Sequence, residues 1–211
     1  VLMVDMSDIW RLVQIGRTEI LPGLVQTIAV SDGIMYVGGT FTGVAVYDVA
    51  EPGDPVRLGG FGAAVPCLAL VVDETIAYVG EQDRLAVYDI SVPTAAVLLG
   101  HCPLSGTVQQ IALSGTVAYV AAAAGGTHVV DISNPAAPVR IGGCTTAGQP
   151  SGVAVLGDVL CVTHPASGPE FFDVSNPATP VWRGSYPYDE PMERAALRGS
   201  YAFLPTHYDD L

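Results

Sequence analysis

The sequence predicts an all-β protein, a five-bladed β-propeller with four-stranded blades of about 42 residues. Three observations predict this fold. A phrase such as VVDISNPAAPVRIGG, which begins at Val129, occurs in five versions within 211 residues. A second, apolar phrase such as TIAVSDGIMYVG lies between successive versions. Turn residues separate short apolar runs every 8–12 residues or so, and no stretch has the spacing of an amphipathic helix.

Each version of the first phrase holds one aspartate and, eleven positions later, one glycine. The aspartates are Asp5, Asp48, Asp89, Asp131 and Asp173, and the glycines are Gly16, Gly59, Gly100, Gly142 and Gly184. We expect each aspartate to end a third strand and to accept backbone N–H groups of the turn that follows. This is a structural role and not a catalytic one. The glycine is expected to end the outer strand.

Four strands are predicted in each unit, in a fixed order. The first is apolar, and a tight turn such as Ser31-Asp32-Gly33 leads to a second strand rich in Tyr and Val. The third strand ends at the aspartate, and a turn that usually contains proline leads to the fourth. We treat residues 1–211 as one domain, with units at 18–59, 60–100, 101–142, 143–184 and a fifth made of 1–17 plus 185–211.

The fifth unit is divided between the two ends of the sequence. Its two outer strands come first and its two inner strands come last, so joining them would close the ring and remove exposed sheet edges. We therefore expect a closed propeller. The rival is a set of five units from a longer propeller, which predicts an open edge and aggregation.

Composition excludes several partners. The net charge is −13, so nucleic acid and anionic lipid are not expected. No run approaches the 18–20 or so apolar residues that cross a bilayer, so direct membrane insertion is not expected either. Only 14% of residues are charged, against about 25% in typical domains. A surface with so few charges is typical of one that a protein partner covers.

Loops that join second to third strands share one face of a propeller with the loops between blades, and binding sites usually lie there. The candidate ligand-binding residues on these loops are His101, His164, His207, Glu193, Arg194, Tyr186 and Tyr188. The loop at 121–124 and the loop at 186–188 are candidate contact surfaces. The candidate metal ligands are the histidines His101, His164 and His207, together with Asp209, Asp210, Glu81 and Asp83. No histidine spacing typical of a metal site supports this, so we expect no metal, no other cofactor and no catalytic residue.

Two familiar propeller functions fit the sequence poorly. A glycosidase needs two carboxyl groups beside one bond, but the expected inner-strand mouths carry a single acid. These mouth residues are Gln26, Pro66, Gln109, Ser151 and Glu193. A lectin with five equal sites would repeat its polar loops, and the loops differ. Cys102 and Cys144 fall in adjacent units, where a disulfide would form only if the loops bend toward each other.

The phrases VVDISNP and FFDVSNPATPV resemble LVIVD repeats, which occur in bacterial and archaeal surface or secreted proteins. The resemblance covers the chain, although the first version, DMSDIW, lacks the proline. It implies a β-propeller fold and an extracellular, cell-surface or periplasmic location, and it says little of function.

We therefore expect a non-enzymatic binding or scaffold module with a protein partner, within a larger assembly or at the cell surface; a small molecule or glycan is the other ligand class. One alternative is an enzyme or metal-binding protein with a single site near the central channel. Another is a structural repeat of a cell-surface layer.

Overall fold

A computed structural model describes residues 1–6, 13–17, 24–40, 43–62, 64–188 and 192–205. This part of the chain is all-β, with four antiparallel four-stranded sheets and two two-stranded hairpins. We call each four-stranded sheet a blade. Within the described residues, no helix is both long enough and apolar enough to cross a membrane.

Strands follow one another along the chain within every blade. The first blade contains β3 (Val25–Ser31), β4 (Ile34–Gly39), β5 (Val44–Asp48) and β6 (Val56–Phe61). The second contains β7 (Cys67–Asp73), β8 (Ile76–Glu81), β9 (Arg84–Asp89) and β10 (Val97–Pro103). The third contains β11 (Gln110–Ser114), β12 (Val117–Ala121), β13 (Thr127–Asp131) and β14 (Val139–Cys144). The fourth contains β15 (Gly152–Leu156), β16 (Val159–Thr163), β17 (Glu170–Asp173) and β18 (Val181–Ser185).

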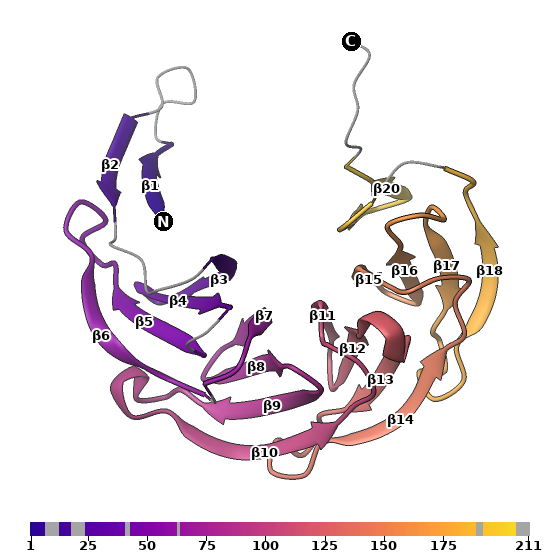
Figure 1. Cartoon of the computed structure of the whole chain (residues 1–211), viewed down its shortest axis with the longest axis horizontal. Helices are drawn as coiled ribbons and strands as arrows, with labels where there is room; N and C mark the ends of the chain where they lie inside the picture. The colour runs from indigo at the N-terminus through magenta and orange to yellow at the C-terminus, as the bar shows by residue number, and fades with distance from the viewer. Residues whose placement is uncertain (7–12, 18–23, 41–42, 63, 189–191, 206–211) are drawn as a thin grey trace.

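The blades lie along an open arc (Figure 1). Their first strands, β3, β7, β11 and β15, face the centre, and their fourth strands, β6, β10, β14 and β18, form the rim. The hairpins lie at the two ends of this arc. One pairs β1 (Leu2–Asp5) with β2 (Val13–Arg17), and the other pairs β19 (Ala196–Arg198) with β20 (Tyr201–Phe203). Two short 3₁₀ helices, η1 (Pro93–Ala95) and η2 (Ala123–Gly125), lie in loops.

The repeated aspartates stabilise the turns after the third strands. In four units, a carboxylate oxygen accepts the backbone N–H of the residue two positions later, at 2.8–2.9 Å; the residues are Asp48, Asp89, Asp131 and Asp173. Hydrogen bonds from Ser133 hold the pKa of Asp131 below its usual value, and those from Ser91 do the same for Asp89. The Asp173 carboxylate also pairs with Arg183 across the strands.

The repeated glycine does not end the outer strand, contrary to the expectation. Gly16 lies within β2 and the other four lie within fourth strands, each immediately after a residue that forms a β-bulge. For example, Gly142 pairs with Val129 and Arg140 pairs with Val130, so Ile141 is the extra residue. A Cβ atom on Gly142 would lie 2.6 Å from the carbonyl oxygen of Ala178 in the next blade. Glycine is thus required at Gly16, Gly100 and Gly142 by a close approach of backbone atoms, whereas at Gly59 a φ of +148° favours glycine.

The core lies between consecutive blades. Three buried clusters each join the second and third strands of one blade to the next blade. Tyr36, Tyr78 and Tyr119 occupy the same position on successive second strands, and each is buried in one of these clusters. The four cysteines are buried and free, so Cys102 and Cys144 form no disulfide here.

The expected joining of the two chain ends into a fifth blade is absent from the structure. Among the described strands, β1 pairs with β2 alone and β20 pairs with β19 alone. The two hairpins face each other across the opening of the arc (Figure 1).

Candidate functional site

A polar pocket of about 310 Å³ lies where the inner strands converge. Its lining comes from all five units and consists of Gln26, Leu68, Gln109, Ser151, Pro165, Glu193 and Arg194. We call it the axial pocket. Four of the five residues expected at the inner-strand mouths therefore meet around one pocket.

One position of the repeat supplies most of this lining. Gln26, Leu68, Gln109, Ser151 and Glu193 follow one another at intervals of 42, 41, 42 and 42 residues. Gln26 and Leu68 are the extra residues of β-bulges at the start of β3 and β7, which separates them from the regular ladder. The expected second-unit residue, Pro66, is wrong, because Leu68 occupies this position in the pocket lining.

Hydrogen bonds fix part of the pocket and leave the rest open to a ligand. The Ser151 hydroxyl donates to the carbonyl oxygen of Met192 at 2.7 Å. The Arg194 guanidinium donates to the Gln26 carbonyl oxygen over a long 3.4 Å, which links the fifth unit to the first across the centre. Glu193 and Arg194 are exposed, so the mouth presents one carboxylate and one guanidinium side by side.

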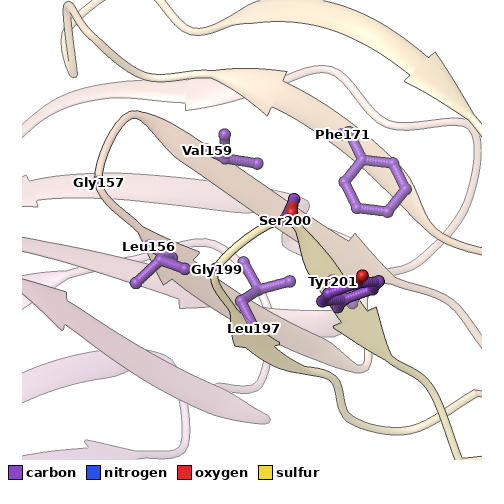
Figure 2. Close-up of a pocket in the computed structure, with 9 residues that line it drawn as sticks. Leu156, Gly157, Val159, Phe171, Leu197, Gly199, Ser200 and Tyr201 are labelled. Atoms are coloured by element: carbon purple, nitrogen blue, oxygen red, sulfur yellow. The ribbon is translucent and has the colours of Figure 1, made fainter.

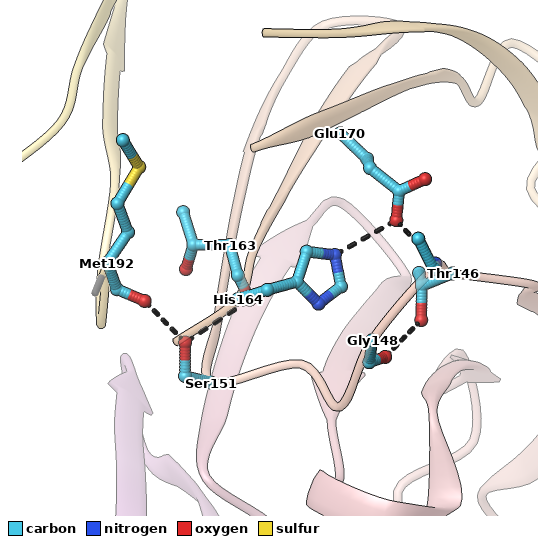
Figure 3. Close-up of polar contacts among 8 residues, drawn as sticks. Thr146, Gly148, Ser151, Thr163, His164, Glu170 and Met192 are labelled. Carbon is cyan, nitrogen blue, oxygen red and sulfur yellow. Dashed lines mark hydrogen bonds and ion pairs between the residues drawn. The ribbon is translucent and has the colours of Figure 1, made fainter. Parts of the chain in front are cut away.

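A polar network joins Ser151 of the axial pocket to Thr163 and Met192 (Figure 3). The Thr163 hydroxyl donates to the Glu193 carbonyl oxygen at 3.2 Å, and the Met192 N–H donates to the His164 carbonyl oxygen at 3.3 Å. Together with Ser151, these bonds tie the segment that carries Glu193 and Arg194 to the fourth blade. The backbone of Met192 and Glu193 is therefore held by two side-chain hydroxyls and one backbone carbonyl of the fourth unit.

His164 is fully buried in this network and pairs with Glu170. Its Nε2 lies 2.9 Å from a Glu170 oxygen, which also accepts the Ala147 N–H at 3.0 Å. If Nε2 carries the proton that the carboxylate accepts, Nδ1 is left as an acceptor. Nδ1 is buried and has no hydrogen-bond partner among the described residues. The pair therefore orients the ring, but Pro165, and not the ring, lines the pocket.

The other sequence candidates lie in different places. His101 was expected on a loop, but it lies within β10 at the rim, opposite Ala86 and exposed, so it does not join the pocket. Tyr186 follows β18 and donates its N–H to Pro169, and Gly168 lies against Tyr186 and Tyr188. These two tyrosines therefore flank the loop that begins at His164.

Three metal candidates lie outside the described residues: His207, Asp209 and Asp210. Within the described ranges, no group of three or more His, Cys, Asp or Glu side chains could hold a metal ion. In the loop at 121–124, the first two alanines are buried, so only its later part offers a contact surface.

Glu81, a candidate metal ligand in the sequence, is a second buried carboxylate at the end of β8. It accepts the Tyr88 hydroxyl at 2.7 Å and the Arg84 Nε–H at 2.9 Å. Burial and the hydrogen bond to Glu81 raise the pKa of Tyr88. The charge of Glu81 is thus neutralised within the second blade, which indicates a structural role. The only sequence signal is an acid and an arginine three residues apart, which is also common on solvated surfaces.

Comparison with solved structures shows the fold. The computationally designed Ika8 protein matches with a TM-score of 0.72 and 14% identity, over 86% of this chain and 55% of that one. A functionally unknown protein from Desulfotomaculum acetoxidans matches with a TM-score of 0.73 and 11% identity, over 88% of this chain and 64% of that one. The designed Ika4 protein matches with a TM-score of 0.59 and 13% identity, over 69% of this chain and 88% of that one. The chain thus spans about half the length of the Ika8 protein.

No curated protein matches the sequence. The LVIVD repeat model matches three consecutive segments, at residues 69–103, 105–146 and 147–187. These segments cover more than half of the chain, and they correspond to the second, third and fourth blades. The chain belongs to the LVIVD repeat family.

Proposed function

We propose that this protein is a non-enzymatic binding module, and that the axial pocket and the loops around it bind a segment of a partner protein. One observation carries the proposal: a single repeat position brings five side chains to one pocket, and their chemistry differs from unit to unit. A position with only a packing role in a repeat protein would hold similar residues in each unit. Gln26, Leu68, Gln109, Ser151 and Glu193 instead give an asymmetric lining, which suits one ligand in one orientation.

The lining favours a peptide segment as the ligand. Gln26 and Gln109 each carry an amide that can donate and accept, as a peptide group does. Arg194 can pair with a carboxylate, and Glu193 with a cation or an N–H group. At about 310 Å³, the pocket is at the small end of the usual range of ligand sites, roughly 300–1,000 Å³. It therefore fits one or two side chains of a protruding loop.

Binding is favoured over catalysis because the described lining contains one carboxylate, Glu193, and acid–base hydrolysis of a glycoside needs two. The alternative, an enzyme or metal-binding protein, would need catalytic or metal-binding side chains that do not line this pocket. A location at the cell surface or outside the cell, within a larger assembly, is part of the same proposal. The acidic, weakly charged composition supports it, since such a surface suits a protein partner.

The test is a peptide selection. A library of displayed peptides is panned against the protein, and the affinities of enriched peptides are measured by calorimetry. Gln109→Trp should fill the pocket and weaken binding at least tenfold, whereas Val139→Trp on the exposed rim strand β14 should leave it unchanged. Both variants are checked for native circular dichroism. Failure to enrich any peptide, or equal binding to both variants, would refute the proposal.

We further propose that the β1–β2 and β19–β20 hairpins are the outer and inner halves of one blade. In complete blades, the aspartate that ends the third strand lies opposite the first residue of the second strand, as in Ile34–Asp48 and Val159–Asp173. The same repeat position places Tyr201 opposite Asp5. The cross-linking experiment below tests this pairing.

A further inference from the structure

An apolar groove of about 510 Å³ separates the fourth blade from the β19–β20 hairpin (Figure 2). Leu156, Val159 and Phe171 line one side of it, and Leu197, Tyr201 and Ala202 line the other. The turns at Gly157 and Gly199 lie at one end. We call this the terminal groove. In the rest of the arc, buried clusters fill the corresponding space between blades.

The repeat shows that side chains of the hairpin are uncovered where their equivalents are buried. Phe203 is 56% exposed. The residues at its position in the four blades are at most 6% exposed: Tyr36, Tyr78, Tyr119 and Cys161. Ala202 is also exposed, and its equivalents are buried: Met35, Ala77, Ala118 and Leu160. Among the described strands, no third or fourth strand covers this hairpin.

The β1–β2 hairpin also has exposed side chains at positions that are buried in complete blades. Val4 is 43% exposed and Met6 is 69% exposed. In the cluster between the third and fourth blades, the residues at these positions are Phe172 and Val174, and both are buried. Tyr88 and Ile90 have the same role between the first and second blades, and Val130 and Ile132 between the second and third. Val4 and Met6 are thus the side chains that the terminal groove lacks.

We propose that the terminal groove and the edge of β20 bind the β1–β2 hairpin of a second copy of this chain, so that copies join end to end and each junction completes a blade. This rests on the pairing of half-blades proposed above. Strand addition to an open sheet edge supplies the backbone hydrogen bonds, and Val4 and Met6 supply the apolar contact. Charge does not oppose the junction: residues 194–203 hold two arginines and no acid, and the described residues of the β1–β2 hairpin, 1–6 and 13–17, hold one aspartate and one arginine.

A second copy, and not the same chain, is inferred because the chain holds its own hairpins apart. The β1–β2 hairpin packs on the first blade, where a Cβ atom on Gly16 would lie 1.9 Å from the Pro52 carbonyl oxygen. The β19–β20 hairpin lies beside β15 at the other end of the arc (Figure 1). Bringing β1 to β20 within one chain would require the clusters between the four blades to repack.

A cross-linking experiment tests whether the β1–β2 hairpin that pairs with β20 comes from a second copy or from the same chain. In complete blades, Tyr36 pairs with Val46 and Tyr119 pairs with Val129, which places Phe203 opposite Met3. Directly opposite residues have Cα atoms about 4.5–5.5 Å apart, within reach of a disulfide. The double variant Met3→Cys/Phe203→Cys is oxidised mildly, and chain masses are read on non-reducing gels. The matched control, Met3→Cys/Ala202→Cys, places the thiols on opposite faces of the sheet.

We expect the correct register to give cross-linked dimers and larger species, and the control to give few. A cross-link confined to single chains would overturn the second-copy inference and leave the half-blade pairing intact. No cross-link above the control would overturn both. The proposed peptide binding at the axial pocket is measured separately and survives either result.

Mixing two variants gives an independent test. Val4→Arg should disable the donor hairpin, and Ala202→Arg the acceptor; each alone should be monomeric in sedimentation velocity. Their equimolar mixture should form a heterodimer and nothing larger, because one junction remains intact. Val139→Arg, on the exposed face of rim strand β14, serves as the control and should assemble as the wild type does. A mixture that stays monomeric would overturn the inference.

Discussion

Replacing Gly142 by alanine should destabilise the protein because a methyl group has no space at this position. The added Cβ would lie 2.6 Å from the Ala178 carbonyl oxygen and 3.2 Å from that of Pro177. Both are backbone atoms, so no flexible side chain can yield. The equivalent substitution Gly184→Ala is a matched control, since its Cβ meets nothing within 4 Å.

The magnitude follows from two opposing effects. Forcing an extra carbon into a packed site costs about 1–3 kcal/mol. Alanine is favoured over glycine within a strand by about 0.5–1 kcal/mol, because it loses less backbone entropy on folding. The second effect is common to both substitutions and cancels between them. The two variants should therefore differ by about 1–3 kcal/mol in the free energy of unfolding, with Gly142→Ala the less stable.

The assay is urea unfolding of dilute protein, followed by circular dichroism and checked by melting temperature. For a chain of this size, each kcal/mol lowers the melting temperature by about 2–4 °C. Gly142→Ala should thus melt about 2–12 °C below Gly184→Ala. Equal stability of the two variants would refute the claim that the repeated glycine is required by contact between blades.

Three further predictions concern buried and turn residues. Glu170→Ala leaves the His164 Nε2 and the Ala147 N–H without an acceptor, and should lower unfolding free energy by about 1–3 kcal/mol in urea titrations, with a smaller loss for Glu170→Gln. The pKa of Asp131 is lowered in the folded state, so its stabilisation is present at neutral pH and lost as acid protonates it. Unfolding free energy should fall below about pH 4, and less steeply in Asp131→Ala than in the wild type; equal acid dependence would contradict this. Burial raises the pKa of three thiols to about 12, so a thiol reagent at about pH 8 should react fast only after unfolding; these are Cys67, Cys144 and Cys161.

The blade architecture could be predicted from sequence because hairpin turns set the register of a sheet. The aspartate of each phrase fixes where a third strand ends, and counting from it places the other strands. Counting along the repeat also predicts that four inner-strand residues lie around the axis: Gln26, Gln109, Ser151 and Glu193. The count is wrong in the second unit, where it predicts Pro66 and the structure has Leu68. The apolar run at 68–72 has no polar residue to mark the register of the strand, and a shift of two positions leaves each side chain on the same face of the sheet.

Other features depend on three-dimensional geometry that the sequence pattern does not specify. The β-bulge before each repeated glycine lets the rim strand continue, so His101 lies on β10 and not on a loop. Burial of the pair His164–Glu170 depends on how the loop at 165–169 packs against Tyr186 and Tyr188.

The most direct test of the account is to map peptide binding by nuclear magnetic resonance. A peptide enriched against the protein is titrated into ¹⁵N-labelled chain, and amide shifts are followed residue by residue. The account predicts that the largest shifts fall on the five units at once, at Gln26, Leu68, Gln109, Ser151 and Glu193. Shifts confined to the rim strands or to the terminal groove would contradict a binding site at the axis.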